Sequence, residues 1–169
     1  MSHIVLTPAT SPQDIRDVRA LFEEYAASLG FSLCFQGFDR ELAELPGSYA
    51  PPAGRLLLAR ADGAPAGCAG LRKIEEGICE MKRLFVRPQQ RGTGLGQRLA
   101  TSLIDEARRA GYATMKLDTL PSMKAAIRLY ESLGFRDTAP YTVNPIGEAR
   151  FMELALTPTP HGQGARRIR

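Results

Sequence analysis

The stretch that decides the fold reads Glu80-Met81-Lys82-Arg83-Leu84-Phe85-Val86-Arg87-Pro88-Gln89-Gln90-Arg91-Gly92-Thr93-Gly94-Leu95-Gly96-Gln97. It has the pattern of a strand, a turn with glycine at every second position, and the start of an amphipathic helix. Glycine has no Cβ, so successive backbone N–H groups of such a turn can gather on one side of the chain. The helix that follows adds unpaired N–H groups and the positive end of its dipole. The stretch therefore predicts a phosphate-binding turn.

Two nucleotide-binding motifs do not fit this turn. A P-loop ends in Gly-Lys followed by Ser or Thr, whereas Gly96 is followed by Gln97 and Arg98. A dinucleotide fingerprint needs glycine in the sixth place counted from Gly92, and that place holds Gln97. A glycine-rich loop that merely makes the turn is the remaining alternative.

Two motifs together resemble the GNAT superfamily of N-acetyltransferases. The family motif Gln/Arg-x-x-Gly-x-Gly/Ala is matched by Arg91, Gly94 and Gly96. The downstream family motif Asn-x-x-Ala-x-x-Leu-Tyr-x-x-x-Gly-Phe is matched by residues 123–135 except at its first position, which is Met123. The resemblance covers about residues 1–157.

The resemblance implies an α/β fold with a mixed, mostly antiparallel sheet of about seven strands, a splayed parallel pair of fourth and fifth strands, and about four flanking helices. The sequence pattern predicts strands near residues 4–6, 56–59, 66–71, 78–86, 115–118, 135–141 and 150–156. Helices are predicted from Pro12 to Gly30, over 39–45, from Leu95 to Gly111, and around Tyr130. We expect one domain over 1–157 and a basic, disordered Pro/Gly-containing tail over 158–169.

The resemblance also implies that acetyl-CoA lies between the splayed strands. The backbone of Leu84, Phe85 and Val86 is expected to pair with the pantetheine amides. The pyrophosphate is expected on the N–H groups of Arg91, Gly92, Thr93, Gly94, Leu95, Gly96 and Gln97. The resemblance places Met123 and Ala126 beside the pantetheine, and Met123 lacks the amide of the usual Asn.

Catalysis in this family is a direct attack of an amine on the thioester, with no covalent enzyme intermediate. Tyr130 matches the tyrosine that acts as general acid toward the sulfur, and its alternative is a plain core tyrosine. Glu80 is the candidate base, because several family members have a base glutamate there. A water chain is the rival base, and a salt-bridged strand glutamate is the alternative reading of Glu80.

The acceptor is predicted to be a small primary amine, such as an amino acid or a peptide end. An amphipathic pocket could be lined by Phe31, Phe35, Gln36 and Tyr141. A carboxylate could be held by Arg72, Lys82 and Arg83, unless these cations only cover the sheet surface. Two further functions stay open: a peptide or protein N-acetyltransferase, and a non-catalytic sensor that binds acyl-CoA.

Composition excludes several other classes of protein. The chain has 169 residues, 44% hydrophobic and 24% charged, which is ordinary for one soluble globular domain. Its net charge of +4 falls to about +1 without the three arginines of the tail, so a nucleic-acid partner is not predicted. No membrane span or signal peptide is predicted, which makes a cytoplasmic location the default. The spacing of the cysteines and histidines predicts no metal site, and a homodimer stays open.

Overall fold

The computed structural model describes residues 2–30, 32–33, 37–144 and 147–156. Its strands form one seven-stranded sheet in the order β1-β2-β3-β4-β5-β7-β6. The strands are β1 (Ile4–Pro8), β2 (Arg55–Ala61), β3 (Ala64–Glu75), β4 (Ile78–Val86), β5 (Thr114–Thr119), β6 (Arg136–Asp137) and β7 (Arg150–Ala155). The helices are α1 (Pro12–Ser28), α2 (Phe38–Glu44), α3 (Leu95–Arg109) and α4 (Lys124–Ser132), with 3-10 turns η2 (Gly47–Tyr49) and η3 (Pro88–Gln90).

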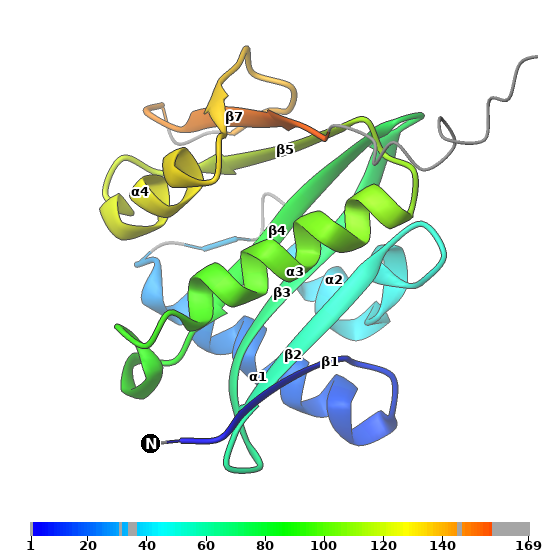
Figure 1. Cartoon of the computed structure of the whole chain (residues 1–169), viewed down its shortest axis with the longest axis vertical. Helices are drawn as coiled ribbons and strands as arrows, with labels where there is room; N and C mark the ends of the chain where they lie inside the picture. Colours follow the sequence, from blue (N-terminus) through cyan, green and yellow to red (C-terminus); the bar gives the residue numbers. More distant parts are fainter. Residues whose placement is uncertain (1, 31, 34–36, 145–146, 157–169) are drawn as a thin grey trace, which may run out of the picture.

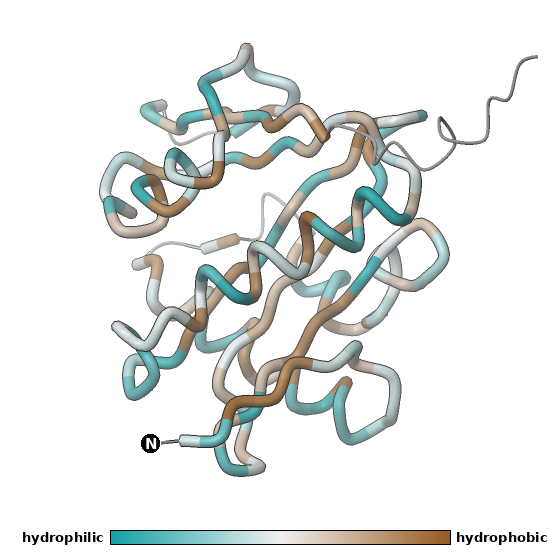
Figure 2. Tube along the Cα trace, in the orientation of Figure 1, coloured by the Kyte–Doolittle hydropathy of each residue, from teal (hydrophilic) through white to brown (hydrophobic). Residues whose placement is uncertain are grey.

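The sheet separates two hydrophobic clusters. Helix α3 crosses one face, and α1 and α2 lie on the other (Figure 1). Leu99 and Leu103 of α3 pack with Met115 and Leu117 of β5 in the first cluster. The second cluster joins α1 and α2 to the opposite face of the sheet. Hydrophobic residues run along β2 and recur on α3 between hydrophilic ones, as expected for a covered strand and an amphipathic helix (Figure 2).

The parallel pairing of β4 with β5 is short. It joins Ile78 to Thr114, Cys79 to Met115, and Glu80 to Lys116. Every other pairing in the sheet is antiparallel. No pairing is made beyond Glu80 in the part of the two strands that the structure describes. The two strands therefore diverge at the end that faces α4, and the predicted splay is confirmed.

A bulge in β4 lies at this divergence. Arg83 and Leu84 stand opposite Ala69 alone, between the pairs Cys68–Phe85 and Gly70–Lys82. Arg83 has φ 60°, a left-handed conformation that is uncommon for a residue with a side chain. A bulge bends its strand and re-aims the side chains next to it. The strand thus changes direction where the splay opens.

The penultimate strand is shorter than the prediction of 135–141, since β6 spans only Arg136–Asp137. Thr138 still donates its N–H to the Phe151 carbonyl at 2.8 Å. Pro140 follows, and proline has no N–H to donate to a strand ladder. The chain then crosses the sheet and places the Tyr141 hydroxyl 2.6 Å from Glu80 Oε2. The predicted tail 158–169 lies outside the described residues.

Candidate active site

Two adjoining cavities occupy the splay. The larger, of about 430 Å³, lies where the N-terminal ends of α3 and α4 face β4. The smaller, of about 50 Å³, lies between the diverging ends of β4 and β5. Tyr25, Leu84 and Met123 line both of them. The two cavities therefore form one path from the α3 and α4 face of the sheet into the splay.

Most of the predicted cofactor residues line the larger cavity. They are Leu84, Phe85, Val86, Arg91, Gly92, Gly94, Leu95, Gly96, Met123 and Ala126. Thr93 and Gln97 are not among its lining residues. Thr93 instead donates its hydroxyl to the Gln90 carbonyl at 2.6 Å, which fixes the turn from outside. Thr93 therefore contributes no side chain to the lining of the larger cavity, and the binding of pyrophosphate by the backbone of the turn stays a prediction.

The glycine turn has the geometry of an anion cradle. Gly92 and Gly94 have φ 80° and 84°, which only glycine adopts without strain. Gly94 is the N-cap of α3 and makes no side-chain cap, so that end of the helix offers its N–H groups to a ligand. Arg91 donates from Nε to the Val86 carbonyl at 3.1 Å and keeps its positive charge at the edge of the cradle.

The smaller cavity has the Tyr130 side chain in its wall. Tyr130 is 7% exposed and packs edge-on against Phe135, with ring centroids 5.7 Å apart. Burial raises the pKa of Tyr130 well above its usual value, so the phenol keeps its proton. No residue that the structure describes makes a hydrogen bond to this hydroxyl. A buried hydroxyl without a protein partner fits a site that receives a polar ligand group.

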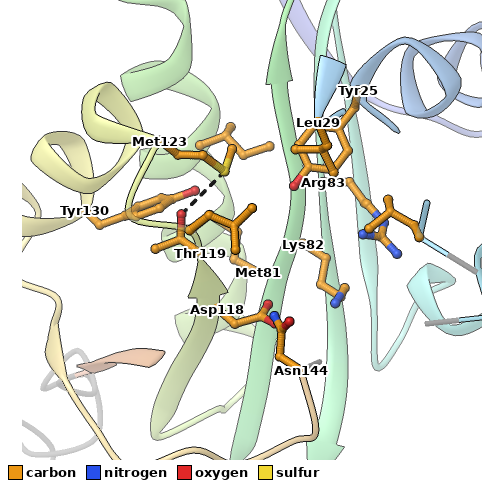
Figure 3. Close-up of a pocket in the computed structure, with 13 residues that line it drawn as sticks. Tyr25, Leu29, Met81, Lys82, Arg83, Asp118, Thr119, Met123, Tyr130 and Asn144 are labelled. Atoms are coloured by element: carbon orange, nitrogen blue, oxygen red, sulfur yellow. Dashed lines mark hydrogen bonds between the residues drawn. The ribbon is translucent and has the colours of Figure 1, made fainter. Parts of the chain in front are cut away.

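Met123 sets the local chemistry where the two cavities meet. Its sulfur accepts a hydrogen bond from Thr119 Oγ1 at 3.7 Å, drawn as a dashed line in Figure 3. Met123 is also the N-cap of α4 and makes no side-chain cap. At this corner the chain therefore presents a thioether and backbone groups where the family motif has an amide.

Glu80 lies at the last residue pair before the splay. It is 1% exposed and lines neither cavity. Arg72 Nε lies 2.8 Å from its Oε1, and the Tyr141 hydroxyl lies 2.6 Å from its Oε2. Lys82 Nζ is 3.8 Å from the same Oε2. The structure thus brings the candidate base beside the splay but surrounds it with three donors.

The predicted acceptor residues divide into three groups. Phe31, Phe35 and Gln36 lie outside the described residues. Arg72 is paired with Glu80, as described above, and Tyr141 packs edge-on against Phe151 at 5.5 Å between ring centroids. Tyr141 lies outside the linings of both cavities.

Arg83 and Lys82 both line the smaller cavity, but they are held differently. Arg83 donates to both carboxylate oxygens of Glu41 at 2.8 and 3.0 Å, and its guanidinium lies 5.2 Å from the Phe38 ring centroid. Burial lowers the pKa of Lys82, and the charge of Glu80 opposes this effect. Lys82 Nζ lies 3.8 Å from Glu80 Oε2, so among the described residues it has no carboxylate partner as close as that of Arg83.

Four polar lining residues of the smaller cavity were not predicted: Tyr25 from α1, Asp118 and Thr119 from β5, and Asn144 from the β6–β7 connection. Figure 3 shows Asp118 and Asn144 turned toward each other, and Asn144 Nδ2 donates to Asp118 Oδ2 at 3.1 Å. Asp118 had a signal, since a polar residue that ends a strand at a splay faces the opening. No such signal marked Tyr25 in the sequence, because its place in the helical repeat indicates only that it lies on the packed face of the helix.

Other kinds of site find no support in the described part of the chain. No group of three or more His, Cys, Asp or Glu side chains could hold a metal ion there. Among the same residues, no helix is long and apolar enough to cross a membrane.

Comparisons with known proteins agree with this geometry. A similar protein is an uncharacterised N-acetyltransferase of Schizosaccharomyces pombe, 41% identical over 158 residues, which cover 92% of this chain and 97% of that protein. An IAA acetyltransferase of Azospirillum brasilense is 38% identical over 111 residues, covering 64% and 72% of the two chains.

Solved structures show the same fold. An acetyltransferase of the GNAT family from Staphylococcus aureus aligns with TM-score 0.77 at 17% identity, covering 92% of this chain and all of that one. The yncA protein of Salmonella typhimurium, solved with its cofactor acetyl-CoA, aligns with TM-score 0.65 at 26% identity, covering 90% and 94%. The model of the acetyltransferase (GNAT) family matches residues 18–135. The chain therefore belongs to this family of acyltransferases, which use acetyl-CoA as the acetyl donor.

Proposed function

We propose that this protein transfers the acetyl group of acetyl-CoA to the primary amine of a small molecule that also carries an acid group. The observation that carries the proposal is the smaller cavity, which is narrow and has Lys82 and Asp118 among its lining residues. A cavity of about 50 Å³ suits the reacting end of a small acceptor better than a polypeptide backbone. Opposite charges in one small cavity favour an acceptor with both signs of charge.

The cofactor has matching partners on this chain. The cradle of Gly92, Gly94 and the start of α3 suits the pyrophosphate, and the backbone of the β4 bulge suits the pantetheine amides. Bound there, acetyl-CoA supplies an activated thioester to an amine held in the smaller cavity. The two reactants then meet in one complex, and no acyl-enzyme is needed.

Tyr130 has the protonation state and place of the general acid. Its buried phenol is protonated at neutral pH, because burial raises its pKa. It lines the smaller cavity, which adjoins the larger one, so it can donate its proton to the departing sulfur. Lys82 holds the acid group of the acceptor, because its ammonium lines the cavity and lies 3.8 Å, a loose contact, from Glu80.

The test is a panel of amines with acetyl-CoA, read by release of the coenzyme thiol. We expect turnover with amino acids and other acid-bearing amines, and much slower release with uncharged alkylamines and with a lysine-containing peptide. Lys82→Met, which keeps the length of the side chain, should raise the KM for acid-bearing amines about tenfold or more and leave that for alkylamines unchanged. A peptide as the best acceptor would overturn the small-molecule assignment. Tight acetyl-CoA binding without release for any amine would indicate a sensor.

A further inference from the structure

We propose that Asp118 binds the ammonium of the acceptor and takes its proton, while Glu80 is a positioning residue. This inference rests on the amine acetylation proposed above and assigns a catalytic group within it. Asp118 lies on β5 and lines the cavity in which the amine must sit. Glu80 lies on β4 behind that cavity.

The surroundings of the two carboxylates differ in the way that the two roles require. Asn144 Nδ2 donates to Asp118 Oδ2, and no described residue donates to Oδ1. One oxygen is thus oriented and the other can receive an ammonium. Both oxygens of Glu80 accept close hydrogen bonds, from Arg72 and Tyr141. A base must come within hydrogen-bond reach of the proton that it removes, and Asp118 meets this condition for an amine in the cavity.

The role of Glu80 follows from what it joins. Arg72 belongs to β3, Glu80 to β4, and Tyr141 to the connection between β6 and β7. Asn144, three residues after Tyr141, is the partner of Asp118. Glu80 therefore fixes the segment that orients Asp118. It acts on the reaction through Tyr141 and Asn144, and not by touching the substrate.

The field of Asp118 reaches the side chains around the cavity. Burial is the main cause that raises the pKa of Tyr25, Tyr130 and Tyr141, and the charge of Asp118 raises each of them further. The same charge opposes the lowering of the pKa of Lys82 by burial. The titratable or charged groups near Asp118 come from α1, β4, β5, α4 and the β6–β7 connection: Tyr25, Glu80, Lys82, Arg83, Lys116, Tyr130 and Tyr141.

The protons balance over one turnover. Asp118 takes one proton from the bound ammonium and passes it to solvent, and the free amine attacks the thioester carbonyl. The new N–C bond forms as the C–S bond breaks, and Tyr130 gives its proton to the departing sulfur. The surplus proton on the acylated nitrogen returns to Tyr130 through solvent, which restores the phenol. The net products are the amide, the coenzyme thiol and one proton.

The decisive experiment compares two acceptors of similar shape: a primary amine, protonated at neutral pH, and the corresponding hydrazide, whose nucleophilic nitrogen is unprotonated. We expect Asp118→Asn to lower kcat/KM for the amine by about 10²-fold, within the range of general-base catalysis, and to lower that for the hydrazide much less. Calorimetry should show weaker binding of the amine to the enzyme–coenzyme A complex and unchanged binding of acetyl-CoA.

Glu80→Gln is the matched control: a residue that acts by orienting Asp118 should lower kcat/KM for the amine less than Asp118→Asn does, and should add no further loss in the double variant Asp118→Asn/Glu80→Gln. Equal losses for the two acceptors in Asp118→Asn, or no loss, would refute the assignment of Asp118. A further loss for the amine in the double variant would return the base role to Glu80. Failure of the wild-type protein to acetylate either acceptor would instead refute the proposed function. Unchanged acetyl-CoA binding in both variants shows that they are folded.

Discussion

Replacement of Tyr130 by Phe is expected to raise stability and abolish most of the activity at once. The variant removes one oxygen and leaves the packing of the ring on Phe135 intact. The hydroxyl is buried and has no protein partner among the described residues. A buried polar group without a hydrogen bond costs about 1–3 kcal/mol. We take the lower end, about 1 kcal/mol, because the adjoining cavity can admit water.

A gain of that size should be measurable. For a chain of this length, about 1 kcal/mol corresponds to a rise in Tm of roughly 2–4 °C. The turnover number kcat should fall about 10²-fold or more, because general acid catalysis is lost. That loss is about 2.7 kcal/mol of transition-state stabilisation. The affinity for acetyl-CoA should change little, because Tyr130 contributes a proton to the leaving group and not to the phosphate cradle.

Tyr112→Phe is the matched control for the stability measurement. Tyr112 is also buried, but its hydroxyl donates to the Ala53 carbonyl at 2.6 Å, and it lines neither cavity of the splay. Its removal should lower the free energy of unfolding by about 1 kcal/mol and leave kcat unchanged. Urea unfolding and thiol-release kinetics measure both quantities for each variant.

Two results would refute this reasoning. If Tyr130→Phe lost stability as Tyr112→Phe does, its hydroxyl would have a protein partner in solution, and the site would not be open to a ligand there. If kcat of Tyr130→Phe stayed within a factor of two of the wild type, roughly 0.4 kcal/mol, Tyr130 would not be the acid.

Three further perturbations test the scaffold of the site. Glu41→Ala leaves the buried Arg83 guanidinium unpaired and should cost about 3–5 kcal/mol of unfolding free energy. Burial acts to raise the pKa of Glu41, but Arg83 outweighs it and holds that pKa below its usual value; the contribution should be present at neutral pH and disappear as pH falls through that lowered pKa. The Cβ added in Gly94→Ala would meet no atom within 4 Å, but the φ of 84° is strained for alanine. The substitution should therefore lower the free energy of unfolding by about 1 kcal/mol. It should also weaken acetyl-CoA binding in calorimetry. Hydrogen bonds from the Thr10 N–H and from Arg60 lower the pKa of Asp14 to about 2. Asp14→Asn should therefore lower the free energy of unfolding by about 1 kcal/mol at pH 7, measured by urea unfolding. The difference in unfolding free energy between this variant and the wild type should vanish near pH 2. Equal free energies of unfolding for Asp14→Asn and the wild type at pH 7 would exclude this contribution of Asp14.

The thiol-release assay is compatible with the buried cysteines of this chain. Cys68 and Cys79 are buried and free. Burial raises the pKa of Cys79 to about 12, and it raises that of Cys68 further. Thiols react as thiolates, so both should react slowly with a thiol reagent in the native protein. Rapid labelling of either one before unfolding would contradict the packing described above.

Local sequence predicted the parts of the site that depend on local geometry. The glycines were predicted to form a turn between a strand and a helix, and Gly92 and Gly94 do so with positive φ values. The family motif fixed the place of Tyr130 in the same way. The strand pairing could also be foreseen, because a helix between two consecutive strands requires a parallel crossover.

The partners of the charged residues could not be read from the sequence. Glu80 and Tyr141 are 61 positions apart, and Arg83 and Glu41 are 42 positions apart. Each pair meets only after the strands, the bulge and α2 have taken their places. Arg72 and Arg83 therefore looked free to hold a carboxylate, although the fold pairs both with glutamates. Asp118 ends the predicted strand 115–118 beside the predicted splay, but its contact with Asn144, 26 positions away, could not be read from the sequence.

The N-terminal end of α3 and the Tyr130 hydroxyl have a consequence for thermodynamic linkage. Under the proposed function the partners of both groups belong to the coenzyme, so the folded state should gain interactions on binding that the unfolded chain does not. A ligand present at about 100 times its Kd adds roughly 2.7 kcal/mol to the free energy of unfolding. The resistance of this protein to heat and to proteases should therefore rise and fall with the supply of acetyl donor.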